Sequence, residues 1–347
     1  MTPIETPFVV GPYECVRPLA PPGGEASVFA ARDLRVGADA VPTVAVRVLH
    51  IVDDRTWERA QREALVAGAA QACSAHVVDV LACAEHGAGA WIAMPLIEGV
   101  TLHDLHQGRP ALDEDAFATI LVQVASALAT LHCLGQAVRH GDVKPANVIV
   151  ETFEAPHATL VDLGCVVIGD EPGRRGSWPY TAPQVMAGEV PDLAGRDDVY
   201  ALGMTAAFML TGRAPALGAD GAIDLGDAPL GARYADLLTR ATADRREDRP
   251  TARELAEAIA RRAWPPTVPA RIGALLRAPA VALERPPDAG DVSVPDGLDP
   301  SLRAVIDAAG GNGRDHLLAA RVLERYGFAK DAERTSATGS PASTACA

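Results

Sequence analysis

Residues 140–150 read His-Gly-Asp-Val-Lys-Pro-Ala-Asn-Val-Ile-Val and are the most informative segment of the chain. This segment places the carboxylate of Asp142, the cation of Lys144 and the amide of Asn147 in a loop before a β-branched run that is typical of a strand. Fifteen residues after Asn147, a second strand-like run ends in the carboxylate of Asp162. Phosphoryl transfer needs a base, a cation and hard oxygen ligands for Mg²⁺, and these four side chains are of those types.

The lysine in this loop is unusual for the chain. Lys144 and Lys330 are the only lysines, so the 31 basic residues minus these 2 leave 29 arginines. A polar loop beside a turn is the alternative interpretation. It does not explain why one of two lysines falls between Asp142 and Asn147, so a functional loop is favoured.

At this point a family resemblance is clear. Residues 140–150 resemble the catalytic loop of bacterial eukaryotic-like serine/threonine protein kinases, and Asp162-Leu163-Gly164 resembles their metal-binding triplet. Three later segments resemble, in order, the substrate-docking segment, the helix whose buried Asp steadies the catalytic loop, and the arginine that pairs with the docking segment. They are residues 176–184 (Gly-Ser-Trp-Pro-Tyr-Thr-Ala-Pro-Gln), 198–203 and 249–250, and the whole likeness covers about residues 13–262.

The resemblance implies a role for each residue of the set. Asp142 would accept or orient the proton of a substrate hydroxyl, and Lys144 would neutralise the γ-phosphate of ATP. Asn147 and Asp162 would hold Mg²⁺. A lysine two residues after the Asp is the serine/threonine version, so the expected partner is a protein substrate with Ser or Thr.

Small-molecule phosphotransferases of kinase-like fold also use the His-Gly-Asp spelling, and they are the rival enzyme class. They are not expected to carry a docking segment or the helix of Asp198. This interpretation therefore stands behind that of a protein kinase.

The resemblance weakens in the N-terminal part, where ATP would be held. Arg47, in Val44-Ala45-Val46-Arg47, stands where the family has a lysine that contacts the α- and β-phosphates. Its expected partner on the following helix is Glu63, although a solvated acid on the helix surface is the alternative, since Glu58 lies nearby. Arginine is longer, planar and forked, so the exchange is not conservative at a tight site.

The glycine-rich loop of the family is eroded as well. Aligned on Val28, its three glycine positions become Pro21, Gly23 and Ala26. Proline removes a backbone donor and stiffens the turn, which predicts weaker nucleotide affinity. The hinge that would hydrogen-bond adenine is Met94-Pro95-Leu96-Ile97. The expected ATP-binding residues are Gly23, Gly24, Ala26, Val28, Ala45, Arg47, Glu63, Met94, Pro95 and Ile97.

Two further departures concern regulation. Gly141 replaces the arginine with which family members sense a phosphorylated activation loop, and no Ser, Thr or Tyr occurs from Asp162 to Gly176. Switching by phosphorylation of this loop is therefore expected to be absent. Gln184 replaces a glutamate, which would turn its ion pair with Arg249 into a neutral hydrogen bond.

Two functions follow from these observations. The complete set of Asp142, Lys144, Asn147 and Asp162 favours an active but slow, ATP- and Mg²⁺-dependent serine/threonine protein kinase. Arg47 and the eroded glycine loop favour the alternative, a pseudokinase that acts as a nucleotide-binding scaffold.

The residue pattern predicts an α+β fold of two lobes, a small β-rich N-lobe at 10–97 and a larger helical C-lobe at 98–263. Strands are expected at 44–49 and 91–94, and helices at 55–72, 116–134, 199–211, 233–243 and 251–262. A Pro-rich connector at 264–299, a helical hairpin at 300–327 and a disordered tail at 328–347 would follow.

The bulk composition narrows the partners. A formal net charge of −14 argues against binding to nucleic acid or to an anionic membrane surface. No apolar run is expected to reach the length of a membrane span, and the best stretch is near 201–210. The start of the chain does not read as a signal peptide, and the six scattered cysteines show no metal-ligand or disulfide pattern, so a cytoplasmic location is expected. The oligomeric state is not predicted.

Overall fold

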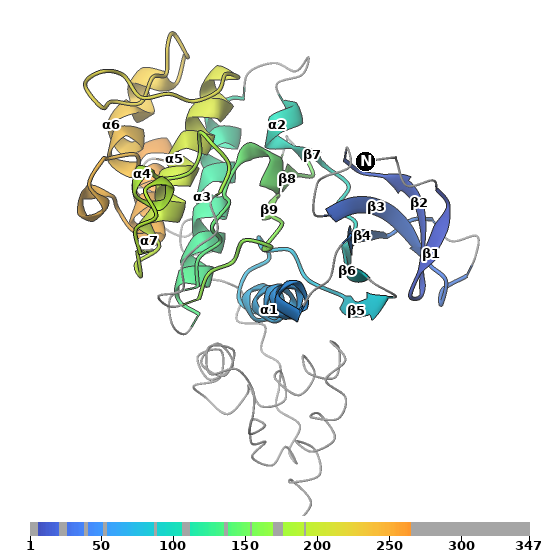
Figure 1. Ribbon diagram of the computed structural model, residues 1–347. Coiled ribbons are helices and arrows are strands. Elements are labelled where there is room, and N and C mark those ends of the chain that lie inside the picture. Colours follow the sequence, from blue (N-terminus) through green and yellow to red (C-terminus); the bar gives the residue numbers. More distant parts are fainter. Residues whose placement is uncertain are drawn as a thin grey trace, which may run out of the picture. The chain divides into compact units, whose positions relative to one another are not determined.

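A computed structural model describes residues 6–20, 26–37, 41–50, 54–86, 89–105, 112–134, 138–152, 155–168, 176–190 and 192–264 (Figure 1). The predicted hairpin and tail, and all of the predicted connector except Trp264, lie outside these residues. The described chain divides into two units. The first comprises the residues up to 69 together with 79–96, and the second comprises 70–78 and the residues from 97 onward.

The first unit is built on an antiparallel sheet of six strands in the order β1-β2-β3-β4-β6-β5. Its strands are β1 (Phe8–Val10), β2 (Tyr13–Pro18), β3 (Ala26–Asp33), β4 (Val44–Leu49), β5 (Ala82–His86) and β6 (Gly89–Pro95). The strand predicted at 44–49 is confirmed, and the one predicted at 91–94 is longer than expected. Helix α1 (Asp54–Gln71) confirms the helix predicted at 55–72.

The two faces of this sheet differ. One face carries a buried hydrophobic cluster that includes Tyr13, Phe29, Val46 and Trp91. Because side chains alternate along a strand, the odd-numbered residues of β4, from Ala45 to Leu49, belong to the opposite face. The hydrophobic cluster therefore covers one face of the sheet, and Ala45, Arg47 and Leu49 lie on the face without it.

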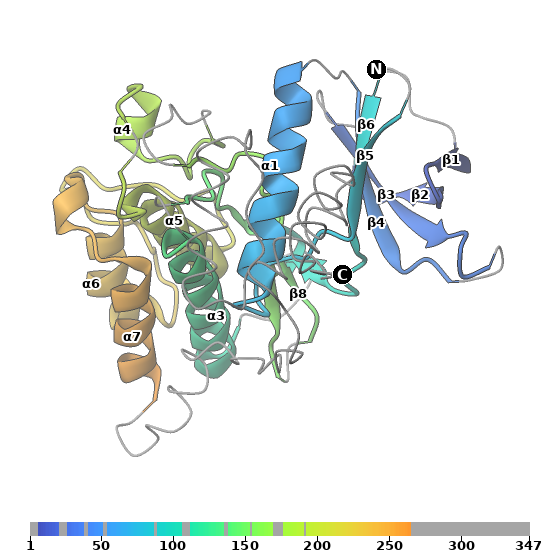
Figure 2. The ribbon, with the colours of Figure 1, turned by 90° about the horizontal axis from the view of Figure 1, so that it is seen from below.

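The second unit is mainly helical. Its elements are α2 (Leu102–Leu105), α3 (Glu114–His132), η1 (Pro145–Asn147), α4 (Pro183–Met186), α5 (Arg196–Thr211), α6 (Gly231–Ala241), η2 (Arg246–Asp248) and α7 (Ala252–Ala263). A small antiparallel sheet joins β7 (Val100–Thr101), β8 (Val148–Val150) and β9 (Ala158–Leu160) in that order. Helix α3 packs along α7, as Figure 2 shows, and it also contacts α5. The predicted α+β class is confirmed.

Helices α3, α5 and α7 each begin directly after an N-cap residue. Asp113 accepts the backbone N–H of Ala116 at 2.8 Å, so α3 starts two residues before the predicted position. Gly195 has a φ of 72° and precedes α5, which starts at Arg196 instead of the predicted 199. At α7 the side chains of Thr251 and Glu254 cap each other's backbone N–H groups.

The expectation that no apolar run reaches the length of a membrane span was wrong. Among the described residues, α3 is the one helix that is long and apolar enough to cross a membrane by length and composition. Of its 18-residue window, 67% is buried inside the structure. Its apolar side chains form part of the core of the second unit.

Candidate functional site

The loop before β8 brings three of the predicted site residues together. Lys144 Nζ donates to Asp142 Oδ2 at 2.6 Å, and Asn147 Nδ2 donates to the backbone carbonyl of Asp142 at 2.9 Å. Asn147 is buried, and the side chain of Asp142 is only 9% exposed. The carboxylate, the ammonium and the amide therefore form one hydrogen-bonded cluster.

Asp162 lies at the same end of the small sheet as Asn147. Val148 pairs with Leu160 in the antiparallel register of β8 and β9, and the N–H of Val161 donates to the carbonyl of Asn147 at 2.9 Å. The residue after Val161 is thus held next to the loop. Asp162 has a φ of 64°, and its Oδ1 accepts the N–H of Gly164 at 3.3 Å. A positive φ in a residue other than glycine is uncommon and marks a constrained turn.

The oxygens of Asn147 and Asp162 fit a hard divalent cation by their chemistry. The amide nitrogen of Asn147 faces the carbonyl of Asp142, which orients its Oδ1 the other way. Within the described residues, no group of three or more His, Cys, Asp or Glu side chains is arranged to hold a metal. Mg²⁺ commonly uses only one or two protein ligands beside water and phosphate oxygens, so a pair of oxygen donors is compatible with it.

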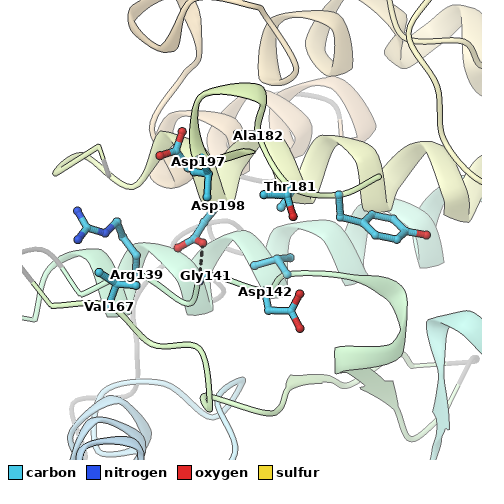
Figure 3. Close-up of a pocket in the computed structure, with 12 residues that line it drawn as sticks. Arg139, Gly141, Asp142, Val167, Thr181, Ala182, Asp197 and Asp198 are labelled. Carbon is cyan, nitrogen blue, oxygen red and sulfur yellow. Dashed lines mark hydrogen bonds between the residues drawn. The ribbon is translucent and has the colours of Figure 1, made fainter. Parts of the chain in front are cut away.

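A buried carboxylate at the start of α5 accepts hydrogen bonds from the backbone of the loop. Asp198 Oδ1 accepts the N–H of Gly141 at 2.9 Å, and its Oδ2 accepts the N–H of His140 at 2.8 Å (Figure 3). His132 Nε2 lies 2.9 Å from the same Oδ2. Burial alone would raise the pKa of Asp198, but the hydrogen bonds and the charge of His132 hold this pKa below its ordinary value. The predicted support of the loop by Asp198 is confirmed.

The side chain of His140 joins the two parts of the cluster. Its Nε2 lies 3.2 Å from the carbonyl of Val161, and its Nδ1 accepts the N–H of Asp142 at 3.3 Å. A carbonyl only accepts, so Nε2 carries the proton in this arrangement. His140 thereby links the strand that leads to Asp162 with the backbone of Asp142.

Residues 176–184, which we call the docking segment, lie against Asp142. The N–H of Ser177 donates to Asp142 Oδ1 at 3.0 Å, and Lys144 Nζ donates to Ser177 Oγ at 2.8 Å. A Cβ at Gly176 would lie 2.8 Å from the carbonyl oxygen of Gly141, so this close approach needs glycine. Sequence reasoning missed Ser177 as a partner of Asp142, because no local pattern reveals a contact across 35 positions.

The predicted contact between the docking segment and Arg249 is also present. Arg249 Nη2 donates to Gln184 Oε1 at 2.8 Å, which confirms the neutral hydrogen bond expected from the exchange of Glu for Gln. Arg249 also forms an ion pair with Asp197, at 3.1 Å between Nη1 and Oδ1. This second contact was not predicted.

A pocket opens between the loop, the docking segment and α5 (Figure 3). Asp142 lies on its wall, and much of the rest is apolar, with Val143, Val167 and Val185 among the lining residues. Gly141 contributes no side chain, and its φ of 78° is one that other residues rarely adopt. Thr181 Oγ1 is buried there without a hydrogen-bond partner among the described residues.

The first unit gathers five of the ten predicted nucleotide-binding residues on one face of its sheet. Val28 lies opposite Arg47, and Ala45 lies opposite Met94, so these four residues share the face that does not carry the hydrophobic cluster. Ala26 belongs to the same face, opposite Leu49.

The predicted pair of Arg47 and Glu63 is formed. Arg47 Nη2 and Glu63 Oε2 are ion-paired, and the side chain of Glu63 is only 2% exposed. The alternative, in which Glu63 is a solvated acid on the surface of α1, is therefore wrong. A buried carboxylate that binds a cation from the sheet fixes the orientation of α1 within the first unit.

The remaining predicted residues lie elsewhere. Gly23 and Gly24 fall outside the described residues. Pro95 ends β6 and lies opposite Val44. Ile97 is the first residue of the second unit after that strand, and its carbonyl accepts the N–H of Gly99 at 3.1 Å.

Comparison with known proteins agrees with these geometries. A family model described as the protein kinase domain matches residues 23–259. The serine/threonine-protein kinase PknD of Mycobacterium tuberculosis is 31% identical over 214 residues, which are 59% of this chain and 30% of PknD. The serine/threonine-protein kinase pkn3 of Myxococcus xanthus is 32% identical over 203 residues, 56% of this chain and 36% of pkn3. The chain thus spans about a third of the length of these relatives.

A solved structure is similar over the same region. The crystal structure of the Mycobacterium tuberculosis PknI kinase domain, in a double mutant, superposes with a TM-score of 0.59 at 28% identity. The match covers 76% of this chain and all of that chain. The sheet of the first unit and the helices of the second unit are therefore those of a protein kinase-like fold.

Proposed function

Because the chain belongs to the protein kinase domain family, we propose that it is a serine/threonine kinase that uses ATP and Mg²⁺ to phosphorylate a protein hydroxyl. The observation that carries this proposal is the environment of Asp142. Its two carboxylate oxygens are held by different groups, Oδ1 by the N–H of Ser177 and Oδ2 by Lys144. Such fixed geometry is what a group that orients an attacking hydroxyl requires.

In the proposed reaction, a Ser or Thr oxygen forms a bond to the γ-phosphorus while the bond from that phosphorus to the bridging oxygen breaks and ADP leaves. Asp142 orients the hydroxyl and accepts its proton. Lys144, 2.6 Å from Asp142, stabilises the negative charge on the transferred group. The docking segment contacts Asp142 through the backbone N–H of Ser177. A polypeptide substrate bound to this segment would therefore present its hydroxyl at that carboxylate.

Asn147 and Asp162 would hold the metal ion, as their oxygen donors and their position at one end of the small sheet suggest. When bound, Mg²⁺ would neutralise phosphate charge. The protein's own contribution is to keep the two donors in place. Asn147 does so through its hydrogen bond to the carbonyl of Asp142, and Asp162 through its turn to Gly164.

On the first unit, the face that carries Val28, Ala45, Arg47 and Met94 would hold the nucleotide. Arg47 would supply the positive charge for its phosphates, and Glu63 would position Arg47. Arginine at this place and the loss of glycines before Val28 predict weak binding of ATP and a slow reaction.

Arg47 also favours a second candidate function, that of a pseudokinase. Its ion pair with Glu63 satisfies a buried carboxylate whether or not a phosphate is bound. A chain that kept this pair for stability alone would bind nucleotide, or act as a scaffold, without transferring phosphate.

Transfer of labelled phosphate from ATP to a generic protein substrate separates the two. We expect slow, Mg²⁺-dependent labelling that Asp142→Asn and Asp162→Asn each abolish while the fold is retained. Binding of an ATP analogue, followed by fluorescence, provides the second readout. Binding without any labelling by folded, Mg²⁺-loaded wild-type protein would reject the kinase and support the pseudokinase.

A further inference from the structure

The docking segment lacks the glutamate that its arginine partner would pair with, yet that partner is buried. Arg249 is fully buried, with a side-chain exposure of 0%. Its guanidinium lies 4.9 Å from the centre of the Tyr200 ring. Gln184 offers it only a neutral oxygen, and the carbonyls of Ala243 and Asp244 offer two more. A buried guanidinium surrounded by neutral acceptors is unstable unless a carboxylate is nearby.

That carboxylate comes from the first turn of α5. Asp197 Oδ1 lies 3.1 Å from Arg249 Nη1, and the side chain of Asp197 is 10% exposed. Burial lowers the pKa of the Arg249 guanidinium, and the charge of Asp197 opposes this effect. Asp197 thus takes over the ionic part of a contact that Gln184 makes only as a hydrogen bond.

The same carboxylate also binds a second arginine. Arg246 Nε donates to Asp197 Oδ1 at 2.9 Å, and Arg246 Nη2 donates to Asp197 Oδ2 at 2.9 Å, which is a bidentate pair. Arg246 Nη1 continues to the carbonyl of Val190 at 3.0 Å and to the carboxylate of Glu189 at 3.3 Å. Asp197 is therefore connected to both ends of residues 184–190, through Arg249 at Gln184 and through Arg246 at Val190.

We propose that Asp197 is a positioning residue for the docking segment and for residues 185–190, which follow it. Asp197 supplies from α5 the carboxylate that Gln184 does not supply. Its neighbour Asp198 points the other way and holds Gly141, as Figure 3 shows. Two consecutive carboxylates of one helix thus fix two different parts of the site. Asp198 fixes the loop of Asp142, and Asp197 fixes the segment 184–190 that follows Ser177.

A charge-relocation experiment tests this inference. Asp197→Asn removes the charge and keeps the size, and Gln184→Glu returns a carboxylate to Arg249 from the docking segment. We expect Asp197→Asn to speed hydrogen exchange of the backbone amides of residues 186–189 by about tenfold or more, with α3 and α7 unchanged. The double variant Asp197→Asn/Gln184→Glu should recover a large part of that protection, although Arg246 then keeps only its ionic contact with Glu189 and its hydrogen bond to Val190.

The matched control is Asp236→Asn. Asp236 also pairs with an arginine, Arg262, at 2.9 Å between Oδ2 and Nη2, but its side chain is exposed and contacts neither Arg249 nor Arg246. Asp236→Asn should leave hydrogen exchange of the backbone amides of residues 186–189 unchanged. Unchanged exchange in Asp197→Asn, or no recovery in the double variant, would overturn the inference. Should Asp197→Asn fail to fold, folding of the double variant supports the inference and its failure to fold overturns it.

A kinetic measurement adds a readout that rests on the proposed kinase function. Asp197→Asn should raise KM for the protein substrate about tenfold with a smaller change in kcat, and Gln184→Glu should restore KM in the double variant. A tenfold loss in kcat without any change in KM would contradict a role of Asp197 in docking the substrate. Because hydrogen exchange needs no activity, an inactive protein with the expected exchange pattern would reject the kinase proposal and leave this inference standing.

Discussion

The backbone N–H of Ser177 donates to Oδ1 of Asp142 at 3.0 Å, although 35 positions separate the two residues. The Ser177 hydroxyl also accepts from Lys144, whose ammonium binds the other oxygen of Asp142. The docking segment and the catalytic loop therefore share one hydrogen-bonded network. A change in either one is expected to alter the orientation of the Asp142 carboxylate.

Removal of the Ser177 hydroxyl tests this network. Ser177→Ala leaves the backbone contact to Asp142 intact and removes the hydroxyl that accepts a hydrogen bond from Lys144. Loss of a charge-assisted hydrogen bond should lower kcat about tenfold, which corresponds to ~1.4 kcal/mol. Steady-state kinetics provide the measurement. Ser177→Thr keeps a hydroxyl and should retain most of the rate; an equal loss in both variants would assign Ser177 a role other than the contact with Lys144.

A second test concerns Arg47. Arg47→Lys places a compact ammonium where the ion pair with Glu63 is made, and we expect phosphoryl transfer to rise by about two- to tenfold, up to ~1.4 kcal/mol in the barrier. Glu63→Gln is the matched control, because it weakens the same pair from the other side and should lower the rate. A fall in activity on Arg47→Lys would show that the guanidinium has a role of its own.

The activation loop, between Asp162 and Gly176, provides a third test. No Ser, Thr or Tyr occurs between Asp162 and Gly176, and Gly141 has no side chain to bind a phosphate there. Protein treated with a phosphatase should therefore keep its initial rate within about twofold, as expected when no switch worth more than ~0.4 kcal/mol is removed. Mock-treated protein is the control. A large loss would point to phosphorylation of Ser177, Thr181 or a distant site.

The buried carboxylate of Asp198 predicts a pH dependence of stability. Its pKa in the folded state is lowered, so its stabilising effect is present above the unfolded pKa of about 3.9 and is lost as the pH falls through the lower folded value. Asp198→Asn should cost about 2–4 kcal/mol of unfolding free energy at pH 7, because three polar contacts to a buried charge are weakened. Below pH 4 the difference from wild type should shrink.

Urea unfolding at several pH values measures this effect. Asp236→Asn, whose exposed pair with Arg262 should contribute less than about 1 kcal/mol, is the reference variant. A pH-independent difference for Asp198→Asn would mean that the carboxylate acts through packing, not through its charge.

The sequence alone predicted the fold class, the long helices and two of the side-chain pairs described above. A strand-rich part followed by a larger helical part predicted the α+β class, and the resemblance of residues 140–150 and 162–164 to the kinase family implied the bilobed kinase-like fold. The hydrophobic periodicity located the long helices, and their ends differed by a few residues where Asp113 and Gly195 act as caps. The pairing of Arg47 with Glu63 and of Arg249 with Gln184 also followed from the resemblance to the family.

The contacts of Asp197 and Ser177 became visible only in the folded structure. Asp197 lay just before the helix predicted at 199–211, and nothing local showed that two arginines from around residue 250 would converge on it. Ser177 likewise reaches Asp142 and Lys144 only after the chain has folded back. The physical reason is that a sequence pattern reports periodicity and short spacing, whereas the pairing of a buried charge depends on which distant groups share its low-dielectric surroundings.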